Sequence, residues 1–268
     1  MASKPWKILG QRQEQEPEQE LTLAVRFSST ARTLAGFADL VPLLDPPLTI
    51  WETAMPTAGT VPPDKYVDWW LADVEQTGKP VRAVFGYCAG SVLAAQLAHR
   101  LAQRQPAPQL VLFDPELPGT DGLYSDFRTA GDGVAAMMAP GELDRYHAAA
   151  QRICAEFADD DVPGVGAALN AVFVATMTGV AQRLGLDDEV RAELSGVFGV
   201  LVEYLVAAGL FDPREMWAQA VAIHSAGGTA DVGRGVVLDV SRDNLLRHID
   251  TARALSGLLG PATAGNPA

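Results

Sequence analysis

The residue best suited to chemistry is Cys88, at the centre of a Gly-x-Cys-x-Gly sequence spanning residues 86–90. Apolar residues at 81–87 predict a buried strand, and the amphipathic pattern over 89–104 predicts a helix. Cys88 is therefore expected where a strand turns sharply into a helix. Such a turn tolerates only small flanking residues and holds the central residue in a strained backbone conformation, with its side chain exposed above the sheet.

This position favours a nucleophilic cysteine. The positive end of the following helix is expected to stabilise a thiolate and to lower the pKa of Cys88. The backbone N–H of Ala89 is a candidate donor to the oxyanion that forms when a carbonyl is attacked. The alternative is a buried structural cysteine in an ordinary strand–helix turn. The second cysteine, Cys154, lies in an apolar stretch and is expected to be a buried helix residue.

The elements around the turn alternate between strand and helix. Strands are predicted at 21–27, 48–54, 81–87, 109–114, 220–225 and 236–240, and helices near 31–43, 64–76, 89–104 and 244–259. This alternation predicts an α/β fold with a mostly parallel, doubly wound sheet covered on both faces.

The chain divides into a core, an insertion and two loose ends. Residues 1–20, rich in Gln and Glu from position 11, are expected to form a disordered lead-in. The core comprises residues 21–117 and 216–260. Between them, residues 118–215 are purely helical in pattern and predict an inserted helical cap, or lid. Residues 261–268 are expected to form a loose tail.

Residues 85–94, Phe-Gly-Tyr-Cys-Ala-Gly-Ser-Val-Leu-Ala, resemble the nucleophile turn of thioesterases from nonribosomal peptide and polyketide synthesis. The resemblance extends weakly over about 21–116 and 216–259, and it implies the α/β-hydrolase fold. It makes Asp114, at the end of a predicted strand, the acid of a catalytic triad. The alternative for Asp114 is a turn residue before a proline.

The same resemblance implies an oxyanion hole and a catalytic histidine. Ala89 would be the first oxyanion donor, and Phe27 or Ser28 the second. The family's histidine follows the last strand, but here Arg242 or Asn244 occupies its place, and cysteine replaces the usual serine.

Another histidine is a candidate for the missing base. His224 ends a predicted strand, and strand ends of this kind converge on active sites. The alternatives are that His224 is structural, or that no histidine serves.

These features predict acyl transfer. A thiol is nucleophilic without a strong base, whereas hydrolysis of the acyl-enzyme requires deprotonation of water. We expect Cys88 to take an acyl group from a thioester and to pass it to a small acceptor, by transfer or cyclisation rather than hydrolysis. The resemblance implies an acyl or peptidyl carrier protein as donor, presenting its substrate on a phosphopantetheine arm, with no bound cofactor.

Three residues are candidates for contact with the acyl group: Tyr87, beside the nucleophile, and Met137 and Met177 in the cap. The two methionines are equally suited to packing the cap itself. Two other functions remain open, a hydrolytic releasing or editing thioesterase and a non-catalytic relative that binds a carrier protein.

The composition of the chain limits the classes of partner that we expect it to bind. The net charge of −13 argues against nucleic acid or an anionic membrane surface. No uninterrupted apolar run approaches the ~20 residues that cross a bilayer, and the N-terminal residues lack the centre of a signal peptide. A cytoplasmic protein is the simplest interpretation. Close metal-ligand spacing and a glycine-rich phosphate loop are both missing from the sequence, so a metal or nucleotide site is not predicted.

Overall fold

The structure is a computed structural model that describes residues 4–10, 20–27, 35–57, 59–158, 160–228 and 232–260. Its centre is a seven-stranded sheet with the order β1-β3-β2-β4-β5-β6-β7. The first strand runs antiparallel to β3, and the other neighbouring strands pair in parallel. The strands are β1 (Trp6–Leu9), β2 (Leu21–Val25), β3 (Ile50–Thr53), β4 (Val81–Tyr87), β5 (Gln109–Phe113), β6 (Val221–His224) and β7 (Arg234–Val237).

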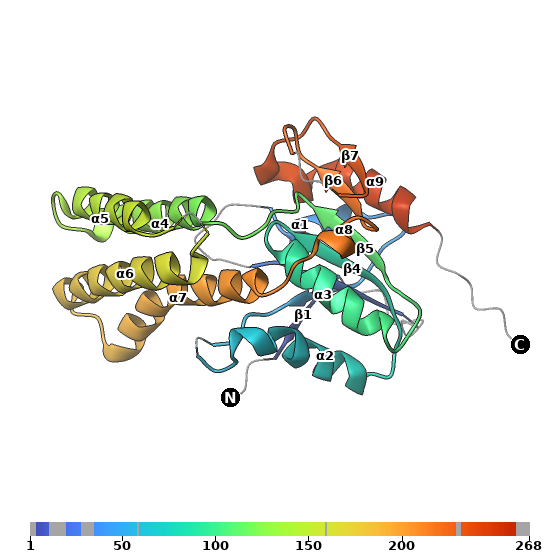
Figure 1. Cartoon of the computed structure of the whole chain (residues 1–268), viewed down its shortest axis with the longest axis horizontal. Coiled ribbons are helices and arrows are strands. Elements are labelled where there is room, and N and C mark those ends of the chain that lie inside the picture. The colour runs from blue at the N-terminus through green and yellow to red at the C-terminus, as the bar shows by residue number, and fades with distance from the viewer. Residues whose placement is uncertain are drawn as a thin grey trace, which may run out of the picture.

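Helices cover both faces of this sheet, as Figure 1 shows. Successive strand residues point to opposite faces, so Leu23 and Val25 of β2 join one apolar cluster and Ala24 joins the other. The first cluster includes α2 (Tyr66–Gln76) and α3 (Gly90–Ala102). The second includes α1 (Phe37–Leu40) and α9 (Ile249–Leu259). Burial on both sides explains why β2 and β4 are rich in apolar residues.

The cap is inserted between β5 and β6. It contains α4 (Thr120–Val134), α5 (Glu142–Glu156), α6 (Val162–Leu184) and α7 (Asp188–Gly209), and a short helix, α8 (Arg214–Trp217), returns the chain to the sheet. Two helical hairpins extend side by side away from the core (Figure 1). Stacked rings of Phe127 and Tyr146, with centroids 4.0 Å apart, join α4 to α5.

Helices α6 and α7 are long and apolar enough to cross a membrane by length and composition. The sequence search for uninterrupted apolar runs did not anticipate them. Both helices pack against each other and against α4, and about a third or more of each apolar window is buried. Since core helices of soluble proteins pass the same test, this is weak evidence for membrane insertion.

The main departure from the predicted elements is β1. The lead-in predicted for residues 1–20 is wrong at Trp6–Leu9, which forms an edge strand. Trp6 anchors it, because its indole N–H donates to the Trp70 carbonyl oxygen at 3.1 Å. Residues 11–19 and the predicted tail at 261–268 lie outside the described residues.

Two smaller differences lie at the ends of the core. Strand β7 begins at Arg234, two residues before the predicted start, and is exposed at the sheet edge. The predicted helix at 31–43 is represented by Phe37–Leu40 and a 3₁₀ turn at Val41–Leu43, whereas residues 31–34 lie outside the described part.

Candidate active site

Cys88 occupies the sharp turn between β4 and α3. Its φ of 54° lies in the left-handed region, which costs a non-glycine residue on the order of 1–3 kcal/mol. Two backbone hydrogen bonds hold it there: its N–H donates to the Phe113 carbonyl oxygen at 3.0 Å, and its own carbonyl oxygen accepts from the Ser91 N–H at 3.0 Å. The strained turn expected from the sequence is therefore present at Cys88.

The two glycines of the turn are required by space. A Cβ at Gly86 would lie 2.5 Å from the Ser91 Cα, and a Cβ at Gly90 would lie 2.5 Å from the Val25 carbonyl oxygen. Both contacts involve backbone, which cannot move aside cheaply. The small residues flanking Cys88 thus let α3 begin directly above the sheet.

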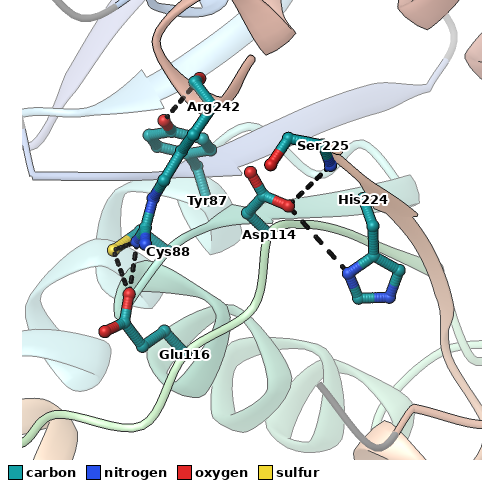
Figure 2. Close-up of polar contacts among 7 residues, drawn as sticks. All are labelled: Tyr87, Cys88, Asp114, Glu116, His224, Ser225 and Arg242. Atoms are coloured by element: carbon teal, nitrogen blue, oxygen red, sulfur yellow. Dashed lines mark hydrogen bonds and ion pairs between the residues drawn. The ribbon is translucent and has the colours of Figure 1, made fainter. Parts of the chain in front are cut away.

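The Cys88 sulfur contacts two charged side chains (Figure 2). Arg242 Nη2 lies 2.9 Å from Sγ, and Glu116 Oε2 accepts a hydrogen bond from the thiol at 3.5 Å. Arg242 also donates to the same Glu116 oxygen, so the three groups form a closed cluster. A backbone hydrogen bond from the Glu116 N–H to the Cys88 carbonyl oxygen, 3.4 Å long, fixes Glu116 beside the turn.

Arg242 begins the 3₁₀ helix Arg242–Arg247 that follows β7. The structure therefore distinguishes between the two residues predicted to occupy the place of the histidine. Arg242 reaches the sulfur, whereas the Asn244 side chain is exposed and donates to the Ser241 hydroxyl at 3.0 Å. Sequence reasoning did not single out Glu116, although its place two residues after Asp114 at a strand end was an available signal.

The charges around the thiol oppose one another. Burial raises the pKa of the Cys88 thiol, the Arg242 guanidinium lowers it, and the Glu116 carboxylate raises it, with a raised pKa as the net result. The lowered pKa expected from the sequence is therefore wrong, because burial outweighs both the cation and the N–H of Ala89. Burial alone would lower the pKa of Arg242, but the negative charges of Cys88 and Glu116 raise it, so the guanidinium stays protonated.

Asp114 and His224 form a separate buried pair. Asp114 follows β5 with a φ of 41°, and its Oδ1 accepts from the Ser225 N–H at 2.8 Å. His224 Nδ1 lies 3.9 Å from the same oxygen. In Figure 2 the imidazole and the Cys88 sulfur lie on opposite sides of Asp114. The structure thus brings His224 to the predicted acid but not to the predicted nucleophile.

A cavity of about 100 Å³ adjoins Cys88. Arg26, Phe27 and Tyr87 line it from the core, with Ala89 at the helix start. On the cap side, one face of α7 closes the cavity with Val197, Phe198, Leu201, Tyr204 and Leu205.

Of the residues predicted to contact an acyl group, Tyr87 lines the cavity. Met137 and Met177 do not line it, and Met177 is 1% exposed within the first apolar cluster, which the cap shares with the core. The physical reason is that α7 rather than α6 returns the chain towards the sheet (Figure 1). Met177, on α6, packs instead within the first apolar cluster.

Two of the three predicted oxyanion donors lie in the part of the chain that the structure describes. Ala89 and Phe27 both border the cavity next to Cys88, as an oxyanion hole requires. Ser28 lies outside the described residues. Across the described ranges, no group of three or more His, Cys, Asp or Glu side chains is placed to hold a metal ion.

No protein-family model matches the sequence, and no curated protein matches it. Solved structures do resemble the fold. A hydrolase from Oleispira antarctica, olei00960, has 15% identity and a TM-score of 0.50, with 96% of this chain and 94% of that chain covered. The enol-lactonase of Burkholderia xenovorans LB400 has 14% identity and a TM-score of 0.50, with 95% of each chain covered. The Vlm2 thioesterase domain matches with 14% identity, coverage of 98% and 99%, and a TM-score of 0.47.

The chain has the α/β-hydrolase fold, as predicted. At such low identity the likeness establishes the fold and leaves the activity to be argued from the site itself.

Proposed function

We propose that this protein is an acyl-transfer enzyme whose Cys88 takes an acyl group from a thioester and passes it to an acceptor. The observation that carries the proposal is the cluster at the sulfur. A cysteine on a strained strand–helix turn meets a cation and a proton acceptor at 2.9 and 3.5 Å, beside a cavity. A structural cysteine needs neither group.

The cluster supports a balanced acylation step. The thiol proton of Cys88 passes to the Glu116 carboxylate, and the Arg242 guanidinium stabilises the sulfur anion that remains. The sulfur then attacks the thioester carbonyl carbon, forming a new C–S bond. The bond to the donor's sulfur breaks, and that leaving thiolate recovers the proton from Glu116. One thioester replaces another, so the step is close to isoenergetic.

The arrangement favours transfer over hydrolysis. Among the described residues, the polar partners of the sulfur are Glu116 and Arg242, and His224 is on the far side of Asp114. In the part of the chain that the structure describes, no imidazole contacts the sulfur to act as a base for water. An amine or thiol acceptor needs less assistance, because it is a stronger nucleophile. The base role predicted for His224 has no contact with the sulfur to support it.

The class of donor is proposed from the sequence and the approach to Cys88. A second cavity, bordered by Cys88, Glu116 and Leu117, opens beside the cluster and offers a path for a thioester-bearing arm. The sequence resemblance at 85–94 supports an acyl or peptidyl carrier protein of secondary metabolism as the donor, and the cytoplasm is proposed as the compartment. The carrier, the acceptor and the compartment are all part of this proposal.

Intact-mass measurement tests the proposal. The protein is mixed with a panel of acyl-phosphopantetheine and acyl-carrier thioesters, and a gain of one acyl mass is expected. Cys88→Ala should abolish the gain, whereas the control Cys154→Ala, in the cap helix α5, should retain it. Acylation of Cys88→Ala at the wild-type rate would exclude the covalent mechanism.

Two further outcomes distinguish the alternatives. Rapid turnover to free acid in buffer alone would establish a hydrolytic thioesterase. If no thioester acylates Cys88 while a carrier protein still binds, the protein is a non-catalytic binding relative.

A further inference from the structure

Tyr204, in the cap helix α7, is a candidate for a further catalytic residue. Its side chain is 0% exposed, and its ring packs against Phe27 with centroids 5.4 Å apart. The hydroxyl points into the seam between the end of β2 and the start of α3. A Cβ placed on Gly90 would lie 2.6 Å from this hydroxyl and 3.1 Å from the Arg26 Cα. The hydroxyl therefore lies beside Gly90, and Tyr204 lines the same cavity as Ala89 and Phe27, two of the predicted oxyanion donors.

This hydroxyl has no hydrogen-bond partner among the described residues. The other buried tyrosines each have one: Tyr66 donates to Glu203 at 3.2 Å, Tyr87 to the Arg242 carbonyl oxygen at 3.4 Å, and Tyr146 to the Phe127 carbonyl oxygen at 2.9 Å. Burying a hydroxyl without a partner costs free energy, so native interiors rarely retain one without a reason. A group that meets its partner only when a ligand fills the adjoining cavity has such a reason.

We propose that the Tyr204 hydroxyl donates a hydrogen bond to the carbonyl oxygen of the acyl group while the Cys88 sulfur attacks its carbon. The inference deepens the proposed acyl transfer and rests on it. As the C–S bond forms, the π pair of the carbonyl moves onto its oxygen, and the resulting negative charge accepts the Tyr204 hydrogen bond. When the bond to the donor's sulfur breaks, the carbonyl re-forms and Tyr204 keeps its proton throughout.

The pKa of Tyr204 agrees with a hydroxyl that always carries the proton it donates. Burial raises the pKa of Tyr204 well above its ordinary value, and the nearby Cys88 raises it further. The hydroxyl therefore stays protonated at every physiological pH. Because donors preorganised in a water-poor site act on charge that develops in the transition state, such a hydroxyl accelerates the chemical step more than it tightens substrate binding.

With Tyr204 as a donor, the cap takes part in the acylation of Cys88. Phe198, Leu201 and Leu205 lie on the same face of α7 as Tyr204 and line the same cavity. The helix that encloses the acyl group would then also supply a donor to its carbonyl oxygen. Correct seating of α7 on the core becomes a condition for acylation.

Tyr204→Phe tests this role, because it removes one oxygen atom and keeps the ring. The rate of Cys88 acylation by the best donor thioester should fall on the order of 10²-fold, with KM nearly unchanged. Alkylation of Cys88 by iodoacetamide should keep its wild-type rate, because displacement of iodide creates no oxyanion. The thermal midpoint should not fall, since the lost hydroxyl has no partner.

Tyr146→Phe is the matched control. Tyr146 belongs to the cap, lies outside the cavity at Cys88, and loses a hydrogen bond to the Phe127 carbonyl oxygen. It should lower the thermal midpoint and leave acylation unchanged, the reverse of Tyr204→Phe. Wild-type acylation by Tyr204→Phe would overturn the inference, as would an equal loss of acylation and alkylation, which indicates a structural role. If the wild type itself takes up no acyl group, the proposed function fails, and the role of Tyr204 fails with it.

Discussion

The reactivity of Cys88 should move in opposite directions when its two charged neighbours are neutralised. Arg242 lowers the pKa of the thiol, so Arg242→Gln should raise that pKa further. Glu116 raises the pKa by its negative charge and by accepting the thiol proton in a hydrogen bond, so Glu116→Gln should lower it. The double variant removes one charge of each sign and should lie near the wild type.

The size of these shifts follows from distance and exposure. A charge within about 4–6 Å of a titrating group changes its pKa by about 1–3 units. The two neighbours lie at 2.9 and 3.5 Å from the sulfur, but their side chains are 46% and 45% exposed, so solvent screens them. We therefore expect shifts near the lower limit, about one unit each. At neutral pH, below the raised pKa of Cys88, one unit changes the thiolate fraction about tenfold.

The assay is the rate of iodoacetamide alkylation against pH, followed by intact mass in a Cys154→Ala background so that only Cys88 reacts. At pH 7 the rate should fall several-fold in Arg242→Gln and rise several-fold in Glu116→Gln, because the roughly tenfold change in thiolate fraction is partly offset by the opposite change in thiolate nucleophilicity. Arg253→Gln, an exposed arginine of α9 paired with Asp250, is the control and should change nothing. Shifts of the same sign in the two variants, or none in either, would refute the electrostatic reasoning.

Three further predictions concern the acyl-enzyme, the turn and the cavity. Acyl-Cys88 should persist for minutes or longer in buffer and discharge quickly when an amine or thiol acceptor is added; mass spectra over time would show this, and rapid decay without acceptor would contradict it. Gly90→Ala should unfold the turn, because its Cβ would lie 2.5 Å from the Val25 carbonyl oxygen. Gly257→Ala in α9, where a Cβ meets open space, should instead stabilise the folded protein by about 0.5–1 kcal/mol. Thermal denaturation compares the two variants. Leu201→Trp should fill the cavity and shift acylation towards shorter acyl groups, which competition between donors of different chain length would measure, and an unchanged preference would contradict it.

Much of the core could be predicted because local pattern and tertiary structure agree there. Val81–Tyr87 is a strand at its predicted bounds, since a run buried on both faces leaves few alternatives. The Cys88 turn was predictable because its glycines are fixed by backbone approach rather than by distant side chains. Strand β1 was missed because Trp6–Leu9 is short and adjoins a polar segment, and its stability depends on Trp70, 64 residues away.

The site itself depended on contacts that no local pattern records. Cys88 and Glu116 follow β4 and β5, and Arg242 lies in the turn after β7. The three side chains therefore meet because of the order of the strands in the sheet. Arg242 was anticipated only as one of two residues in a histidine's place. The pKa of Cys88 was misjudged because the helix N-terminus was visible in the sequence, whereas the burial that outweighs it was not.

Under the proposed acyl transfer, an Arg242–Glu116 pair in place of a histidine would decide which acceptors the site can serve. A guanidinium accepts no proton, so proton transfer falls to the carboxylate, and a carboxylate is a weaker base than an imidazole. A thiol gives up its proton to such a base far more readily than water does, because water is a much weaker acid than a thiol. The cluster therefore assists thiols far more than water, while a neutral amine attacks without prior deprotonation. Arg242 stabilises the sulfur anion on either side of an exchange, so the geometry at Cys88 suits the movement of an acyl group between thiols or onto an amine.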